Sequence, residues 1–113
     1  MAAGQLNILI EQGSTFTRTL TIEQTAGVPL NLTGYTFAGK LKRNFADANA
    51  AATFGLTVAN VAAGTVTWTL TSAQTDALAP QVHRYDIEMT ATSSGAVTRL
   101  LEGEAWVSAS ATR

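Results

Sequence analysis

Alternation of apolar and polar residues is the clearest pattern in this chain. In residues 15–22 threonine occupies every odd position, and the even positions are apolar except for Arg18. In residues 65–70 threonine alternates with three apolar residues, namely Val66, Trp68 and Leu70. A period of two with many β-branched residues is typical of a strand that buries one face. Both segments are therefore predicted as strands.

Weaker runs of the same kind predict further strands at residues 6–10, 36–43, 56–58, 82–92 and 97–107. Turn-forming residues separate the runs at 12–14, 26–29, 33–34, 63–64 and 93–95. About seven short antiparallel strands in a chain of this length favour an all-β fold, either a β-sandwich or a small barrel.

Two stretches lack the alternation. Residues 72–78 begin with Ser72, a residue suited to a helix N-cap, and end before Pro80. They are predicted as a short helix that connects two strands. Residues 44–53 are rich in alanine and polar residues and show no period, so we expect an exposed loop there, the most mobile segment of the chain.

The last hairpin has a register that can be predicted. Pairing that runs back symmetrically from a turn at 93–95 places three pairs of residues opposite each other: Thr90 with Thr98, Asp86 with Glu102, and Arg84 with Glu104. The middle pair is unfavourable because both side chains are acidic. A β-bulge at Gly103 would relieve this conflict, since a glycine inside a strand often marks a bulge.

Length and composition indicate one domain, residues 1–113, with a modest core. The chain has 113 residues, and 46% of them are apolar, many of these being alanine. The chain has no cysteine, which excludes disulfides and thiolate metal sites. The N-terminal segment lacks the basic residues of a signal peptide, and no run approaches the ~18 apolar residues of a membrane span. We therefore expect no membrane partner.

Charge is sparse, at 13% of the residues, and the net charge is -1. Nucleic-acid-binding domains usually carry a strong basic excess, so a nucleic-acid partner is not predicted. Lys40, Lys42 and Arg43 form a small basic group. Lysine on an exposed or edge strand prevents unwanted strand pairing, and this interpretation is favoured over oligonucleotide binding.

Catalytic chemistry has little support in the sequence, and the chain is not predicted to be an enzyme. His83 is the only histidine, and it lies in phase with Tyr85, Ile87 and Met89, as a core or edge histidine would. No nucleophile elbow or phosphate-binding loop is present. No catalytic residue and no cofactor are therefore assigned.

Acidic residues cluster on the two strands of the last hairpin: Asp86, Glu88, Glu102 and Glu104. Carboxylate oxygens are ligands for Ca²⁺, but calcium sites usually draw on loop backbone oxygens as well. A solvated sheet face with Arg84 and Arg99 interleaved is the favoured interpretation, and cation binding is the alternative. No metal site is assigned.

The threonine positions of the strands form a candidate interface. Their side chains are polar but uncharged, so another subunit can cover them without the several kcal/mol of desolvation that buried charges require. Permanent assembly, including a homo-oligomer, is therefore expected. The predicted interface residues are Thr15, Thr17, Thr19, Thr21, Thr65, Thr67 and Thr69.

Six phrases follow one another along the chain: Glu11–Phe16, Gly27–Tyr35, Gly64–Thr71, Arg84–Glu88, Arg99–Gly103 and the terminal Thr112–Arg113. In this order they resemble the small β-sandwich domains of tailed-phage particles, especially the N-terminal domain of baseplate upper proteins of the BppU type. This resemblance spans nearly the whole chain. It implies a single immunoglobulin-like sandwich that fixes something to the virion, without catalytic residues.

The resemblance leads to an expected function as a virion structural protein, made in the host cytoplasm, that connects other virion proteins in the tail, neck or baseplate. The alternative is a capsid decoration or cement protein whose partner is the major capsid protein. A second alternative is a carbohydrate-binding module, because β-sandwiches often bind glycans on aromatic platforms. Trp68 is in phase with core residues, so an exposed Trp106 beside Tyr35 or Tyr85 would be needed for such a platform.

Overall fold

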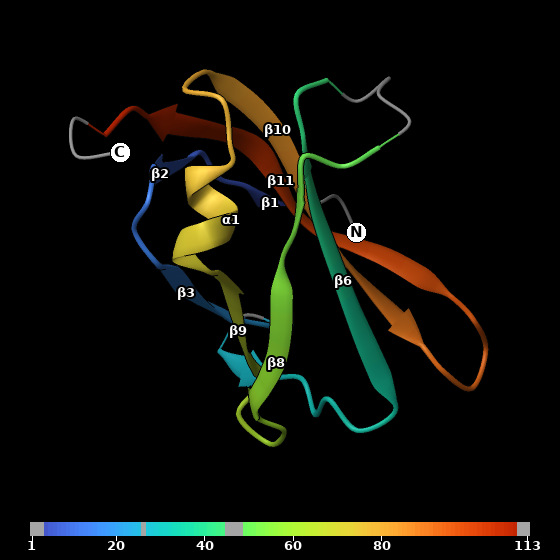
Figure 1. Ribbon diagram of the computed structural model, residues 1–113. Helices are drawn as coiled ribbons and strands as arrows, with labels where there is room; N and C mark the ends of the chain where they lie inside the picture. Colours follow the sequence, from blue (N-terminus) through green and yellow to red (C-terminus); the bar gives the residue numbers. More distant parts are fainter. Residues whose placement is uncertain (1–3, 26, 45–48, 111–113) are drawn as a thin grey trace.

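The structure is a computed structural model that describes residues 4–25, 27–44 and 49–110. Within these ranges the chain forms eleven strands and one short helix (Figure 1). The all-β class predicted from the sequence is confirmed. The strands outnumber the predicted seven because short strands also form at residues 4–5 and 23–25, which no prediction covered, and within segments predicted as a turn (28–29) and a loop (52–53).

The large sheet is built from β1 (Gly4–Gln5), β2 (Ile8–Glu11), β6 (Tyr35–Lys42), β7 (Ala52–Thr53), β10 (Val82–Ala91) and β11 (Val97–Ser108). Its strand order is β1-β11-β10-β6-β7, and β2 also pairs with β11. β1 and β2 run parallel to β11. The prediction that all strands are antiparallel was therefore wrong at the N-terminus, because the first strands pair with the last strand and not with their neighbours in sequence.

The small sheet consists of β3 (Phe16–Thr21), β8 (Gly55–Asn60) and β9 (Thr65–Leu70), in the order β3-β9-β8. β9 has the predicted bounds. A separate two-stranded hairpin joins β4 (Glu23–Thr25) to β5 (Val28–Pro29). β5 falls in a segment predicted as a turn, and Ala26 in that segment lies outside the described residues. Pro29 is tolerated there because a strand at a sheet edge does not need its N–H.

The chain changes sheets at Phe54, which lies between β7 and β8. On one side of it, Lys40 and Leu41 of β6 pair with Thr53 and Ala52 of β7, and on the other side β8 pairs with β9. The Phe54 N–H donates to the carbonyl of Gly39, at 2.9 Å. The loop predicted for residues 44–53 is thus a strand in its last two residues, and residues 45–48 lie outside the described part of the chain.

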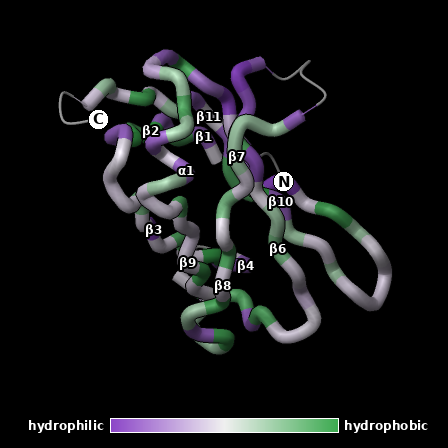
Figure 2. The backbone as a smooth tube through the Cα atoms, viewed as in Figure 1, coloured by the Kyte–Doolittle hydropathy of each residue, from purple (hydrophilic) through white to green (hydrophobic). Residues whose placement is uncertain are grey.

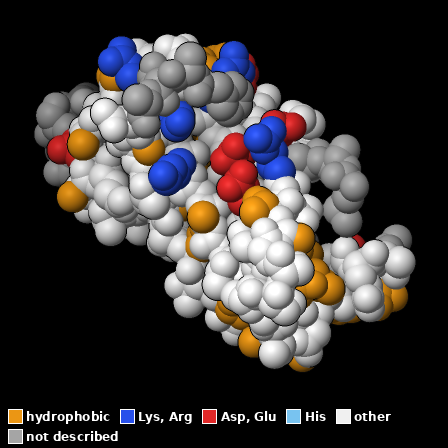
Figure 3. Space-filling model, turned by 90° about the vertical axis from the view of Figure 1, so that its right-hand side faces the viewer, with side chains coloured by type: hydrophobic (Ala, Val, Ile, Leu, Met, Phe, Trp, Pro, Cys, Tyr) orange, Lys and Arg blue, Asp and Glu red, His pale blue; other side chains and the backbone are white. Residues whose placement is uncertain are grey.

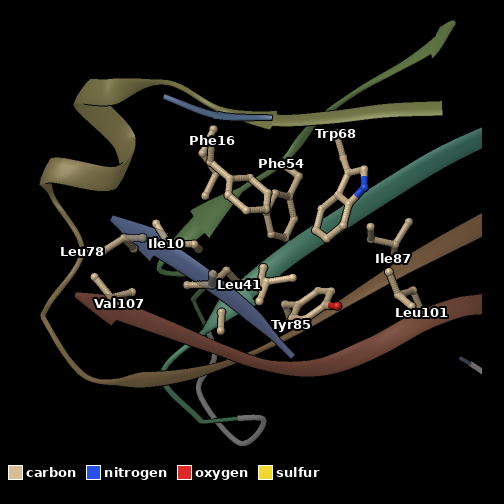
Figure 4. Close-up of a cluster of buried hydrophobic side chains, with 13 residues drawn as sticks. Ile10, Phe16, Leu41, Phe54, Trp68, Leu78, Tyr85, Ile87, Leu101 and Val107 are labelled. Atoms are coloured by element: carbon tan, nitrogen blue, oxygen red, sulfur yellow. The ribbon is translucent and has the colours of Figure 1, made fainter. Parts of the chain in front are cut away.

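Inner side chains of both sheets pack together in the main hydrophobic cluster (Figure 4). Trp68 of β9 is 1% exposed and stacks on Tyr85 of β10, with ring centroids 5.6 Å apart. Phe16 and Phe54 meet the Trp68 ring edge to face, at 5.3 and 5.2 Å. Buried and partly exposed residues alternate along all of β9 and along residues 82–89 of β10. Figure 2 colours the same backbone by the hydropathy of each residue.

The β10–β11 hairpin confirms two of the three predicted pairs, Asp86 with Glu102 and Arg84 with Glu104. The third is wrong, since Thr90 faces Val97. The register shifts by one between Ile87 and Glu88, so the extra residue of the bulge is Leu100 and not Gly103. The two acidic residues therefore do face each other, and Arg99 lies 3.5 Å from Asp86 and 3.4 Å from Glu102.

The predicted helix forms as α1 (Ser72–Asp76), between β9 and β10. Its N-cap is Thr71, one residue earlier than expected. The Thr71 hydroxyl accepts from the N–H of Gln74, while the Gln74 side chain accepts from the N–H of Thr71, which is a capping box. The helix ends without a basic residue in its last turn.

Candidate interaction surfaces

The outer surface of the small sheet brings most of the predicted interface threonines together. Cross-strand pairing on β3 and β9 sets Thr17 opposite Thr69, Thr19 opposite Thr67, and Thr21 opposite Thr65. We call these six residues, with Thr57, the threonine face. Thr15 is exposed but precedes β3, so it lies beside the paired strands and not on them.

Thr57 on β8 was not predicted as part of this surface. It pairs with Thr67, so that Thr19, Thr67 and Thr57 form a continuous row across three strands. The alternation in 55–60 could have identified it, because Leu56 and Val58 are partly buried on the inner side. The first position of β8 is Gly55, where an added Cβ would stand 3.0 Å from the Thr69 hydroxyl.

The threonine face carries no charged side chain. Its β3 threonines are exposed and its β9 threonines are partly buried by their neighbours. Arg18 lies between two of these threonines on β3, so its side chain points to the other side of the sheet. Its guanidinium carbon lies 4.8 Å from the centre of the Phe16 ring, and its Nη1 donates to the Thr17 carbonyl at 3.0 Å. An arginine is accommodated on the apolar side because β3 is an edge strand, from which the side chain reaches solvent.

The second candidate surface is the outer face of the large sheet, where acidic and basic side chains lie side by side (Figure 3). Arg84 forms an ion pair with Glu104. Arg99 contacts both Asp86 and Glu102, so the predicted solvated face with interleaved arginines is what forms here. Among the described residues, no three His, Asp or Glu side chains are close enough together to hold a metal ion.

A hollow of about 540 Å³ lies over this charged face. Its lining comes from β6, β10 and β11: Ala38, Gly39, Lys40, Lys42, Arg84, Asp86, Glu88, Arg99 and Glu102.

Lys40 pairs on one side with Asp86 and on the other with Thr53. The strand is therefore not an edge at Lys40, so the edge part of the prediction was wrong for this lysine, although its side chain is exposed.

His83 lies in the core, one of the two positions that its phase allowed, and is 1% exposed. Burial lowers the pKa of His83 below its usual value, and the nearby Arg43 acts in the same direction, against a smaller opposing effect of the bond to Gln81. Its Nδ1 lies 3.1 Å from the Gln81 carbonyl, whereas Nε2 has no hydrogen-bond partner. A side chain so enclosed is out of reach of a substrate.

The two tryptophans have opposite environments. Trp68 is a core residue, whereas 52% of the Trp106 surface is exposed. Trp106 does not lie beside either tyrosine on an outer surface: Tyr85 is buried between the sheets, and Tyr35 pairs with Ala91 at the far end of β10. The aromatic pair anticipated for a glycan platform is thus not formed.

Comparison of the sequence with protein-family models found no match, and comparison with curated proteins found none either. No helix in the described part of the chain has the length and apolar character needed to cross a membrane.

Proposed function

We propose that this chain is a structural protein of a tailed-phage virion, which connects other virion proteins in the tail, neck or baseplate. The observation that carries the proposal is the threonine face, where seven uncharged hydroxyl side chains lie in register on one three-stranded sheet. A partner that covers it displaces water without burying a charge. The reason for proposing a tailed-phage particle is the resemblance of the ordered sequence phrases to baseplate upper proteins.

We further propose that the fold is a single immunoglobulin-like sandwich. The strand order supports this: β11, β10, β6 and β7 are neighbours in one sheet, and β3, β9 and β8 are neighbours in the other. These correspond to the G-F-C-C′ and B-E-D orders of immunoglobulin domains. In such a domain the threonine face is the outer surface of the B-E-D sheet, which leaves it open to a partner.

The first test is the composition of the particle. We expect mass spectrometry of purified virions from the phage that carries the gene to detect this chain. Its copy number then distinguishes two locations: on the order of hundreds of copies indicates the capsid alternative, and on the order of ten indicates tail, neck or baseplate. Absence from purified virions overturns the proposal.

The second test places a charge on the threonine face. Thr67→Lys should lower incorporation into particles at least about tenfold, because the buried ammonium group adds more than about 1.4 kcal/mol to the free energy of binding. Thr36→Lys is the matched control, since Thr36 is an exposed strand threonine on the other sheet. Both variants must keep the wild-type circular dichroism spectrum. Equal incorporation of the two variants would show that the interface lies elsewhere.

A further inference from the structure

Trp106 is an exposed indole on the outer face of the large sheet, away from the threonine face. Its cross-strand neighbours are Leu9 on β2 and Val82 on β10, so the ring lies in a short apolar row. About half of the Trp106 surface is open to solvent, which for a side chain of this size is a substantial flat apolar surface. The packing of the core does not require it there.

A polar hollow of about 320 Å³ precedes the indole along β11. Its lining residues are Gln5, Asn7, Arg84, Glu102, Gly103 and Glu104. Glu104 precedes Trp106 by two residues on β11, so the two side chains lie on the same face of the strand, about 7 Å apart along it. The apolar ring and the polar hollow are therefore adjacent parts of one surface.

The polar groups of this hollow are held in place by one another. Gln5 Nε2 donates to a carboxylate oxygen of Glu102 at 2.9 Å, and Asn7 Oδ1 accepts from the Glu104 backbone N–H at 3.1 Å. The Arg84 guanidinium is paired with Glu104. These bonds occupy one end of each amide, which leaves the Asn7 NH₂ as a donor and the Gln5 carbonyl as an acceptor within the described residues. Little side-chain entropy is lost when a ligand binds to groups already fixed.

The hollow continues into the larger one over β6, since Arg84 and Glu102 line both. Each volume falls in the range of ligand sites, about 300 to 1,000 Å³. Four basic and four acidic side chains line the combined surface: Lys40, Lys42, Arg84 and Arg99 against Asp86, Glu88, Glu102 and Glu104. This balance gives no net attraction for an anion or a cation, so an uncharged ligand longer than one ring fits best.

We propose that Trp106 and the adjoining hollow bind a neutral hexose oligosaccharide. The C–H face of a pyranose ring would lie against the indole, and its hydroxyls would pair with the Asn7 and Gln5 amides and with the Arg84–Glu104 ion pair. Hydroxyl groups both donate and accept, so they replace the water on these groups bond for bond. A protein partner would instead have to dehydrate the whole ion-pair network, which disfavours it.

The test is a titration followed by ¹⁵N nuclear magnetic resonance with neutral hexaoses of glucose and N-acetylglucosamine, in both α and β linkages where they exist. We expect saturable shifts of the Trp106 indole N–H and of the Gln5 and Asn7 side-chain amides by about 10 mM sugar, as a site of millimolar affinity gives. The Trp68 indole N–H should not move and is the internal control.

Variants separate this site from the proposed interface. Trp106→Ala should weaken sugar binding at least about tenfold, because the stacking surface is removed. Thr67→Lys should leave it unchanged, so loss of particle incorporation and loss of sugar binding are independent results. Asn7→Ala at unchanged stability should weaken binding by a smaller factor, since one donor is lost.

Three results would overturn the proposal. The first is a spectrum that none of the sugars changes. The second is a set of shifts confined to the threonine face. The third is a concentration-dependent shift of the Trp106 indole signal without sugar. If Val97→Ala preserves this shift and Leu9→Ala, next to the indole, abolishes it, the apolar row is a contact between copies of the chain.

Discussion

At the scale of single residues, Gly103 decides where the N-terminal strands can lie. A Cβ at this position would stand 2.0 Å from the carbonyl oxygen of Leu6 and 2.7 Å from its carbon. The same Leu6 carbonyl accepts a hydrogen bond from the Tyr85 hydroxyl, at 2.7 Å. The glycine is therefore needed for the close approach of the backbone between β1 and β2, and not for a bulge in β11.

Gly103→Ala should lower the free energy of unfolding by about 2 to 3 kcal/mol, because the Leu6 backbone between β1 and β2 cannot yield as a flexible side chain would. Urea denaturation measures this. Gly4→Ala is the control, since its added Cβ would meet Leu101 Cδ1 at 3.4 Å, an ordinary contact, and should change stability by less than about 0.5 kcal/mol. Equal stability of the two variants would contradict the assignment.

His83 makes stability depend on pH in a defined direction. Because burial lowers the pKa of His83 in the folded protein, the unfolded chain binds its proton at higher pH than the folded one. The contribution of His83 to the free energy of unfolding is constant well above pH 6.5. It falls as the pH decreases through 6.5 toward the lowered pKa of His83 in the folded protein.

Replacing this histidine tests the direction. Between about pH 7.5 and 5, wild type should lose more stability than His83→Gln, with a difference in slope of at most about 1.4 kcal/mol per pH unit. Urea midpoints measured at each pH give the two curves. Parallel curves would mean that His83 binds its proton equally well in the folded protein and in the unfolded chain.

At the scale of elements, α1 is fixed to the turn before β3 by one buried side chain. Thr75 is completely buried. Its hydroxyl donates to the Ser14 carbonyl at 2.8 Å and accepts from the Gly13 N–H at 3.0 Å. The helix is too short to be stable alone, so this docking and the capping box at Thr71 hold it in place.

Thr75→Val keeps the shape of the side chain but leaves a buried N–H and a carbonyl without this partner. We expect a loss of about 1 to 3 kcal/mol in the free energy of unfolding, measured by thermal or urea denaturation. Thr36→Val, on an exposed strand surface, should stay within about 0.5 kcal/mol of wild type. A loss at position 75 no larger than that of the control would show that the hydroxyl contributes nothing to docking.

At the scale of the whole molecule, the core is uneven. The main cluster lies between the two sheets, and a smaller one, with Ile22, Leu32, Val66 and Met89, lies toward the β10–β11 turn. That end of the large sheet extends beyond the small sheet (Figure 1), and the molecule measures 43 × 27 × 22 Å. Backbone amides at the two ends of β10 should therefore differ in their protection from hydrogen exchange.

Hydrogen exchange followed by nuclear magnetic resonance tests this. We expect the slowest amides in β9 and in residues 83–87 of β10, since both border the main cluster, and faster exchange at 88–91. Equal protection of β9 and residues 83–87 would show that the two sheets unfold as one domain, as the sequence predicts. Uniform protection along all of β10 would contradict the uneven core.

Local pattern was sufficient for much of this protein. Alternation of threonine with Phe16, Leu20, Val66, Trp68 and Leu70 specified two strands and their outer faces, because side chains on a strand point to opposite sides in turn. The same logic put His83 in phase with core residues and predicted two of the three residue pairs of the last hairpin correctly. These features depend on neighbours in sequence, or on a partner strand across one short turn.

Only the tertiary structure decided which distant segments meet. β1 and β2 pair in parallel with β11, which is almost a whole chain length away in sequence. The chain changes sheets at Phe54, and Trp106 stays exposed because no distant segment covers it. Periodicity assigns a side chain to a face but does not say whether another layer covers that face. That is why threonine alternation identified the threonine face, whereas the surface around Trp106 emerged only from the fold.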